Sequence, residues 1–294
     1  MNKCGMVSVV GLPNAGKSSL VNALVGEKVS IVTRKVQTTR MRIMGITTKG
    51  ETQVIFVDTP GFFAPKDRLQ KAMIKAISVG MAEADVILLV VDVHLKDPVE
   101  KNQLLLTRLQ ATEMPIILVL NKVDLVKKER LLEIASAFSD VAKFHHIFMV
   151  SAIEEKEKSG LEKLEQTLEG MMPEGKWLFP EDQYTNISSR VLAAEITREK
   201  VFHFMHDELP YQLHVQTEKW ERLADDSLKI YQVIYIMEKK HRPMILGKKG
   251  EAIKRISMAA RAEMEAVFQT KCHLFLNVSV DEKWQDKKEW GCTR

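Results

Sequence analysis

The chain has 294 residues, of which 45% are hydrophobic and 28% charged, and its formal net charge is +4. This composition is typical of a folded soluble protein long enough for two domains, and the mild positive charge is compatible with nucleic acid or an anionic membrane surface as a partner. The three cysteines, Cys4, Cys272 and Cys292, form no C-x-x-C pair, which argues against a zinc site or a disulfide framework and fits a reducing cytosol. The apolar runs are too short to span a bilayer, and no signal-peptide pattern is expected at the N-terminus.

A predicted phosphate-binding loop follows the first apolar run. The run from Met6 to Val10 predicts a buried strand, a helix is expected from Ser18 onward, and the segment between them matches G-x-x-x-x-G-K-[ST]. In such a loop successive backbone N–H groups surround phosphate oxygens at the positive end of the following helix. Lys17 can reach the β- and γ-phosphates, and the Ser18 hydroxyl can ligate Mg²⁺. The predicted nucleotide contacts in this loop are Gly11, Leu12, Pro13, Asn14, Ala15, Gly16, Lys17, Ser18 and Ser19.

A polar stretch from Thr33 to Arg40 separates this helix from a strand that is expected to begin near Met41. A threonine hydroxyl in such a loop can ligate Mg²⁺ beside the γ-phosphate, and Thr38 and Thr39 are both candidates. An ordinary surface loop is the alternative interpretation of this stretch, since threonine and arginine are common on protein surfaces.

A second phosphate-site motif follows the apolar run Val54–Val57, which predicts a short buried strand. An aspartate at the end of a strand next to a phosphate loop can hold the metal through water, and a backbone N–H at Gly61 can contact the γ-phosphate. A D-x-x-G sequence alone also fits a plain turn, but its position after the phosphate loop favours the nucleotide interpretation. The predicted contacts are Asp58, Thr59, Pro60, Gly61 and Phe62.

A base-reading motif, Asn121-Lys122-Val123-Asp124, follows the strand expected at 115–120. The Asp124 carboxylate can accept hydrogen bonds from the N1–H and the exocyclic amine of guanine, while the Lys122 stem can lie along the base. Adenine lacks both donors, so the motif excludes ATP and with it an ATP-driven transporter or motor. The backbone of Ser151 and Ala152, after the strand at 146–150, is expected to contact the guanine O6.

The strands predicted in the first half alternate with helices, which are expected at 67–82 and 100–109; a further apolar strand is expected at 84–93. Alternation from residue 5 to about 170 predicts right-handed βαβ units in a mostly parallel sheet covered by helices on both faces. Ligands bind at the carboxyl ends of such strands, which is where every motif above falls.

A segment rich in glycine and proline from Gly170 to Pro180 ends this alternation and predicts an interdomain linker. We therefore expect a nucleotide-binding domain at 1–172, a linker at 173–187 and a second domain at 188–294. In the second domain the pattern predicts a helix at 188–209, antiparallel strands at 214–223 and 228–237, a helical region interrupted near 247–250 and continuing to 268, and a strand at 272–280. Five residues of the long helix, Met258, Ala259, Ala262, Met264 and Val267, are interpreted as core.

A Gly-Lys-Lys-Gly turn lies between two predicted helices of the second domain. With the helix–strand–strand–helix–helix–strand order, it resembles the G-x-x-G turn of a KH domain of the bacterial type, type II, whose backbone approaches the sugar-phosphate chain while an apolar groove receives unstacked bases. A plain interhelical turn is the alternative. The predicted RNA contacts are Ile245, Leu246, Gly247, Lys248, Lys249, Gly250, Ile253 and Lys254, and further charge is expected from Lys239, Lys240, His241, Arg242, Arg255 and Arg261, each of which also fits a solvated surface position.

The motifs G-x-P-N-x-G-K-S, Q-T-T-R, D-T-P-G, N-K-V-D and S-A resemble, in order and spacing, those of translation-factor-related GTPases. The Gln37–Arg40 motif together with the second domain resembles the Era family of bacterial ribosome-assembly GTPases over essentially the whole chain. The resemblance implies a P-loop α/β domain followed by a type II KH domain, GTP, GDP and Mg²⁺ as cofactors, and slow GTP hydrolysis. It also implies a monomeric cytoplasmic protein that binds the 3′ end of small-subunit (16S) ribosomal RNA and the 30S precursor.

Three details of the family pattern are assigned to single residues. Phe62 occupies the position where Ras-like GTPases carry a catalytic glutamine, so hydrolysis cannot use that residue to orient water. Asn14 matches a phosphate-loop asparagine that helps hold K⁺ in related GTPases. Thr39 is favoured over Thr38 as the metal ligand because it precedes Arg40 as in related T-T-R loops. The resulting catalytic assignments are Lys17, Thr39 and Gly61, and the metal assignments are Ser18, Thr39 and Asp58 for Mg²⁺ and Asn14 for K⁺.

A membrane-associated regulatory GTPase that acts through a protein or lipid partner is the alternative function. The C-terminal segment Lys283–Trp290 contains lysine and tryptophan, which suit a membrane interface, and also Asp286 and Glu289, which do not. Peripheral contact with the cytoplasmic face of the inner membrane is therefore a secondary expectation.

Overall fold

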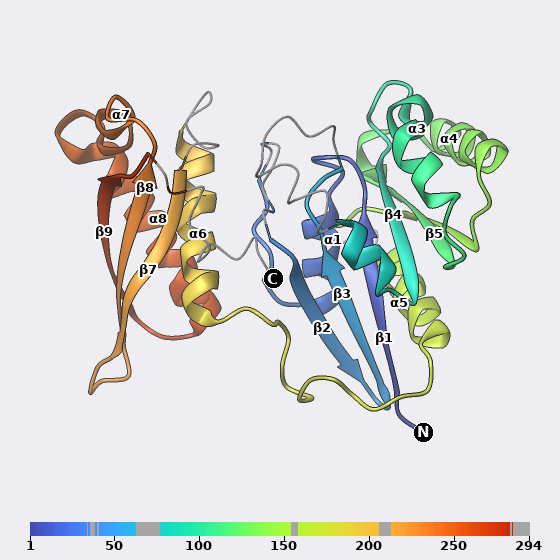
Figure 1. Cartoon of the computed structure of the whole chain (residues 1–294), viewed down its shortest axis with the longest axis horizontal. Helices are drawn as coiled ribbons and strands as arrows, with labels where there is room; N and C mark the ends of the chain where they lie inside the picture. The colour runs from blue at the N-terminus through green and yellow to red at the C-terminus, as the bar shows by residue number, and fades with distance from the viewer. Residues whose placement is uncertain are drawn as a thin grey trace. The chain divides into compact units, whose positions relative to one another are not determined.

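The computed structural model describes residues 1–33, 35, 39, 41–62, 77–153, 158–205, 213–282 and 284, with backbone only at 158 and 159. The chain forms two compact units (Figure 1). The first comprises the described parts of 1–30 and 39–186, and the second comprises those of 31–38 and 187–294. Within the described residues, every helix is too short or too polar to cross a membrane.

The first unit is built on a six-stranded sheet in the order β2-β3-β1-β4-β5-β6. Only the pair β2–β3 is antiparallel, and the other neighbours run parallel, as the alternation of strands and helices predicts. The strands are β1 (Lys3–Val10), β2 (Ile43–Lys49), β3 (Thr52–Asp58), β4 (Val86–Asp92), β5 (Ile116–Asn121) and β6 (His146–Val150).

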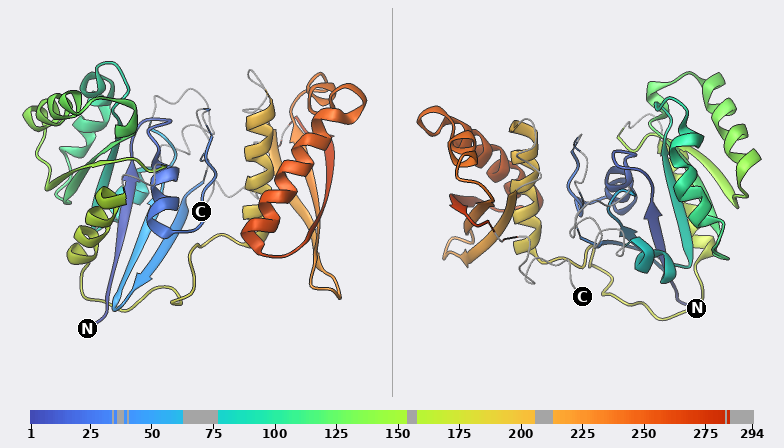
Figure 2. Two further views of the ribbon diagram at one scale, coloured as in Figure 1. Left: turned by 180° about the vertical axis from the view of Figure 1, so that it is seen from behind. Right: turned by 45° about the horizontal axis from the view of Figure 1, so that its top comes forward.

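Helices cover both faces of this sheet, which explains why its central strands are mostly apolar (Figures 1 and 2). On one face lie α1 (Lys17–Val25) and α5 (Lys158–Met171); on the other lie α3 (Pro98–Leu109) and α4 (Lys128–Val141). All seven residues of β4 are buried, and they contribute alternately to the two cores. Residues 77–82 are helical as predicted, whereas 67–76 of that predicted helix lie outside the described residues.

The predicted linker runs along the first unit up to Asn186. The Cys4 N–H donates to the Pro173 carbonyl at 3.0 Å, and the Gln53 amide donates to the Phe179 carbonyl at 2.9 Å. A short bridge also pairs Gly45 with Thr185 at the edge of the sheet. The bridge at Thr185 pairs with β2, which is an edge strand of the sheet, and the other two hydrogen bonds tie the linker to β1 and β3.

The second unit has the predicted order of elements, with α6 (Ser189–Phe204), β7 (Leu213–Arg222), β8 (Leu228–Ile236), α7 (His241–Leu246), α8 (Glu251–Phe268) and β9 (Cys272–Val280). Its sheet has the order β7-β8-β9, in which β7 and β8 are antiparallel and β8 and β9 parallel. The helices α6 and α8 lie against one face of this sheet (Figure 2). Helix α6 ends at Phe204, earlier than predicted, because Met205 is already extended.

Part of the segment after α1 belongs to the second unit. The Val32 N–H donates to Glu199 Oε1 of α6 at 2.8 Å, and the Lys35 ammonium donates to the Met205 carbonyl. Glu199 is buried, and its second carboxylate oxygen pairs with Lys200 at 3.0 Å. Val32 and Lys35 are therefore held by residues that follow in the sequence more than 150 positions later.

Candidate nucleotide-binding site and nucleic-acid groove

The phosphate loop connects β1 to α1, as its sequence predicts. Gly16 precedes the first residue of α1 with a left-handed backbone, φ 93°. A Cβ atom there would lie 2.1 Å from the Asn121 side-chain nitrogen, and one at Gly11 would lie 2.3 Å from the Val90 carbonyl. Both positions therefore require glycine, which lets the loop close tightly over the strand ends.

Lys17 is buried inside this loop. Its ammonium donates to the carbonyls of Gly11 at 3.2 Å and Leu12 at 3.0 Å. Burial lowers the pKa of Lys17 to about 8, against the opposing effect of the nearby Asp58 carboxylate. The cation is thus held where a phosphate would restore the charge stabilisation that burial removes.

Three oxygen-bearing side chains converge beside the loop. Ser18 Oγ donates to Asp58 Oδ2 at 2.7 Å and lies 3.0 Å from Thr39 Oγ1, which lies 3.4 Å from Asp58 Oδ2. Hydroxyl and carboxylate oxygens are the ligands that Mg²⁺ prefers. Thr39 is thereby placed with the other predicted ligands, while Thr38 lies outside the described residues.

The carboxylate of Asp58 fits a divalent cation for a second reason. It is completely buried, and burial raises its pKa although the Ser18 hydroxyl and the Lys17 ammonium act in the opposite direction. Its Oδ1 atom is buried, and no described residue forms a hydrogen bond to it. A bound cation, directly or through water, would stabilise the ionised form and satisfy this atom.

The D-T-P-G segment lies directly against the phosphate loop. The Phe62 N–H donates to the Gly11 carbonyl at 2.9 Å, and the Thr59 hydroxyl donates to the Val9 carbonyl at 2.8 Å. A Cβ atom at Gly61 would lie 2.7 Å from the Pro13 Cα atom, so glycine is needed for this close approach. The segment is therefore positioned to contact the γ-phosphate of a nucleoside triphosphate.

The side chain of Phe62 belongs to the hydrophobic core. It is only 4% exposed, and the Arg108 guanidinium carbon lies 5.0 Å from the centre of its ring. The aromatic residue therefore stabilises the packing between the sheet and α3, and it offers no hydrogen-bonding group to an attacking water.

Asn121 links the base-reading motif to two other motifs of the site. Its side-chain N–H donates to the Ala15 carbonyl at 2.9 Å, and its side-chain oxygen accepts from the Ala152 N–H at 3.2 Å. The register of the parallel strands brings the ends of β4, β5 and β6 side by side, with Asp92, Asn121 and Val150 in one row. The motifs separated in sequence thus form one continuous site.

The remaining residues of the base-reading motif form a short 3₁₀ turn, Val123–Leu125. Lys122 precedes it with a left-handed backbone, φ 67°, and its ammonium pairs with Asp92 Oδ2 at 2.6 Å. Asp124 is exposed, so its carboxylate is accessible to a base, whereas Ser151 is buried beneath the Asn121 bridge. The bridging role of Asn121 and the ion pair of Asp92 were not predicted; the available sequence signal was that both residues end neighbouring parallel strands.

The Gly-Lys-Lys-Gly turn joins α7 to α8. Gly247 and Gly250 both have positive φ angles, 71° and 80°, and a Cβ atom at Gly247 would lie 2.8 Å from the Ala252 nitrogen. Lys248 and Lys249 are exposed at the tip of the turn. The turn therefore presents two cations on a backbone that can approach a phosphate chain closely.

The structure corrects several predictions around this turn. Ile245 is completely buried in the core, so its side chain supports the turn and cannot receive a base. His241 is also buried and cannot extend a charged surface. Met258, which is 55% exposed, and Ala262, which is also exposed, were wrongly assigned to the core, because the buried stripe of α8 passes through Ile256, Ala260 and Met264.

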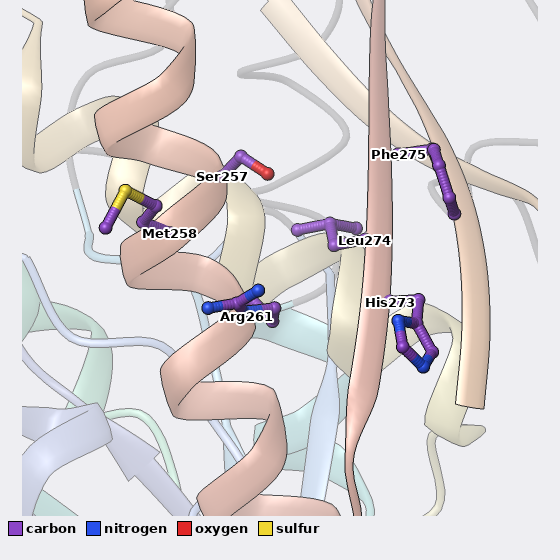
Figure 3. A pocket seen from close by; sticks show the side chains of 6 residues that line it. All are labelled: Ser257, Met258, Arg261, His273, Leu274 and Phe275. Atoms are coloured by element: carbon purple, nitrogen blue, oxygen red, sulfur yellow. The ribbon is translucent and has the colours of Figure 1, made fainter. Parts of the chain in front are cut away.

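A shallow groove of about 230 Å³ lies between α8 and β9. Figure 3 shows Ser257, Met258 and Arg261 on the helix and Leu274 on the side of β9 that faces it. His273 and Phe275 complete the lining from the other side of the strand. Met258 and Arg261 follow Lys254 at helical spacing, so the groove continues the charged face that begins at the turn. Arg261 was predicted to add charge here, and its spacing from Lys254 was the sequence signal for Met258, which was assigned to the core.

Family models of known proteins match both parts of the chain. A family model described as 50S ribosome-binding GTPase matches residues 6–122, and a KH domain model matches residues 208–285. GTPase Era of Maricaulis maris (strain MCS10) is 47% identical over 299 residues, covering 97% of this chain and 94% of the relative.

Two solved structures match the chain over nearly its whole length. A crystal structure of Era with MgGDPNP and nucleotides 1506–1542 of 16S ribosomal RNA has a TM-score of 0.89 and 34% identity, covering 100% of both chains. An Aquifex aeolicus Era variant bound to GDP·AlF4⁻ has the same TM-score and identity, covering 99% of this chain and 100% of that one. The chain therefore belongs to the Era family of GTPases.

Proposed function

We propose that this protein is a GTP-controlled RNA-binding factor that binds the single-stranded 3′ end of 16S ribosomal RNA and assists maturation of the 30S subunit. One observation carries the proposal: a site built from the guanine-nucleotide motifs occurs in the same chain as an exposed Gly-Lys-Lys-Gly turn, which leads into the helix that lines the groove between α8 and β9. The 34% identical Era structure, solved with MgGDPNP and nucleotides 1506–1542 of 16S ribosomal RNA, supports both ligand classes. A cytoplasmic, monomeric protein is part of this proposal.

The chemistry at the nucleotide site is hydrolysis of GTP to GDP and phosphate. Lys17 binds the β- and γ-phosphates and offsets the negative charge that develops in the transition state. Ser18 and Thr39 would hold Mg²⁺ directly and Asp58 through water, and the cation would neutralise the phosphate oxygens. The Gly61 N–H would contact the γ-phosphate, and Asp124 would select guanine.

Hydrolysis is expected to be slow without a further activator, because Phe62 cannot orient water. Asn14, which has a left-handed backbone with φ 62° at the rim of the phosphate loop, would help hold K⁺ in place of an activating arginine. The test compares single-turnover hydrolysis in potassium and sodium chloride at equal ionic strength. A higher rate in potassium that is lost in Asn14→Ala supports this role, and equal rates in the two salts contradict it.

The RNA site is tested by titrating the full chain, loaded with a GTP analogue, with an RNA that matches nucleotides 1506–1542. The double variant Lys248→Asp, Lys249→Asp should lose at least about tenfold in affinity, because two phosphate attractions become repulsions. The matched control is Lys127→Asp, Lys128→Asp, an adjacent exposed pair at the start of α4 in the first unit. Equal loss in both double variants, or no loss in either, would refute the assignment of the turn.

The alternative of a membrane-associated regulatory GTPase rested on the C-terminal segment, of which only Trp284 is described beyond Glu282. Trp284 is 2% exposed and stacks on His214 with ring centres 5.6 Å apart. A buried ring cannot anchor in a membrane interface, so this residue gives the alternative no support.

A further inference from the structure

The sheet of the second unit has an outer face that carries an exposed aromatic pair. Along β8 and β9 the side chains alternate, so that Ile230 and Leu274 pack beneath the helices while Tyr231 and Phe275 extend from the opposite face. Their rings stack with centres 4.8 Å apart and planes 17° from parallel. Phe275 is 48% exposed, which leaves an aromatic surface open to solvent.

Two lysines flank this pair. The Lys229 ammonium lies 5.3 Å from the ring centre of Tyr231 and 5.9 Å from that of Phe275, and the Lys219 ammonium lies 6.0 Å from the ring of Tyr231. Glu221 is the acidic neighbour, opposite Lys229 on the adjacent strand. We call Lys219, Lys229, Tyr231 and Phe275 the aromatic platform.

This combination has the chemistry of a single-strand nucleic-acid contact. Unpaired bases stack on exposed aromatic rings whatever their sequence, and nearby cations attract the phosphates that connect the bases. A protein partner would favour a larger continuous apolar patch, whereas here a small aromatic area lies between two cations.

The platform is continuous with the groove described above. Phe275 belongs to both, since it lines the groove from the far side of β9 and stacks on Tyr231 (Figure 3). His273 also lines the groove and lies opposite Lys229 in the strand register. A strand of RNA that leaves the groove across β9 therefore arrives on the platform.

We propose that the aromatic platform is a second RNA-contact surface, which stacks unpaired bases of the same RNA strand after it leaves the groove between α8 and β9. The inference rests on the proposed RNA-binding function and extends it to the opposite face of the sheet. The groove accounts for about four nucleotides in domains of this class, so only a longer RNA reaches the platform.

The test compares two RNAs taken from the 3′ end of 16S ribosomal RNA, one of about 5 and one of about 12 nucleotides. The full chain is titrated with each, and Tyr231→Leu is the central variant because Tyr231 does not line the groove. It should weaken binding of the longer RNA by about 5- to 150-fold, the range expected for one lost stacked base, and leave binding of the shorter RNA unchanged. Phe275→Trp, which keeps an aromatic surface, should retain binding of the longer RNA.

Charge is tested by Lys229→Gln, with Lys163→Gln on α5 of the first unit as the matched control. Of these two variants, only Lys229→Gln should weaken binding of the longer RNA. If Tyr231→Leu and Lys229→Gln both bind the longer RNA as tightly as the unaltered chain, the proposed role of the platform is wrong, and the assignment of the groove is not affected. Equal weakening of both RNAs by Tyr231→Leu would also overturn it, because the loss would then lie in the groove or the fold. Absence of measurable binding of either RNA by the unaltered chain would instead refute the RNA-binding function itself.

Discussion

Asn121 donates a hydrogen bond from its side-chain nitrogen to the carbonyl of Ala15 at 2.9 Å. This bond joins the motif that selects the base to the loop that binds the phosphates. Because the Asn121 oxygen also accepts from the Ala152 N–H, one buried amide sets the spacing of three segments of the site. We therefore expect a preorganised frame for the nucleotide, in which Asn121 acts by positioning the segments around the ligand.

Replacement of this amide tests the frame. Asn121→Ala leaves the Ala15 carbonyl and the Ala152 N–H without their partner, at a cost of about 1–3 kcal/mol for each buried group. The affinities for GTP and GDP should fall together by about 10- to 100-fold, measured by calorimetry. A loss confined to one of the two nucleotides would contradict a role in positioning the whole site.

Base selection is tested separately by Asp124→Asn. The asparagine amide cannot accept hydrogen bonds from both guanine donors. It can, however, donate to the carbonyl that xanthine carries in place of the exocyclic amine of guanine. The affinity for GTP should fall at least about 100-fold and that for xanthosine triphosphate should rise. Unchanged preference for GTP would place the base-reading contact elsewhere.

The pKa of Lys17 predicts a pH dependence of nucleotide binding. In the nucleotide-free protein burial lowers this pKa to about 8, and a bound phosphate should raise it again. Below pH 8 the ammonium is already protonated, so binding is insensitive to this group. Above pH 8 binding requires proton uptake, and affinity should decrease as the pH rises.

Calorimetry at pH 9 in two buffers with different ionisation enthalpies measures the proton taken up on nucleotide binding. Lys17→Met should abolish this uptake. Identical binding heats in both buffers for the unaltered protein would contradict the assignment of the proton to Lys17.

The same lowered pKa of Lys17 predicts a pH dependence of stability. The nucleotide-free protein should gain stability as the pH rises from 8 to the ordinary lysine pKa, because the unfolded chain binds more protons in that range.

The role of Thr39 is tested by comparing the rate of GTP hydrolysis with the affinity for GDP in a variant. Its hydroxyl lies 3.0 Å from Ser18 Oγ, and a switch threonine ligates the metal only when the γ-phosphate is present. Thr39→Ala should therefore slow hydrolysis by at least about tenfold while the affinity for GDP changes little. The reverse pattern, a normal rate in Thr39→Ala and a slow one in Thr38→Ala, would assign the metal to Thr38.

Much of this molecule could be predicted from the sequence because the relevant signals are local. Apolar runs such as Val86–Val91 mark strands buried on both faces, and the phosphate loop is defined by contiguous residues. The α-β-β-α-α-β order of the second unit was likewise visible in its periodicity and turns.

The errors concern contacts between distant residues. The Asn121 bridge and the Lys122–Asp92 pair depend on strand register, which the order of elements alone does not give. Met258 was assigned to the core because helical periodicity gives the width of a buried stripe but not its rotation about the helix axis. For the same reason, the groove beside α8 could not be predicted: the sequence does not give the rotation of α8 about its axis.

The central claim is that guanine nucleotide controls RNA binding. Its most direct test is the affinity of the full chain for the RNA matching nucleotides 1506–1542, measured with the protein saturated first with a GTP analogue and then with GDP. The account predicts tighter binding in the GTP-analogue state, and loss of that difference in Thr39→Ala. Equal affinity in the two nucleotide states would contradict it.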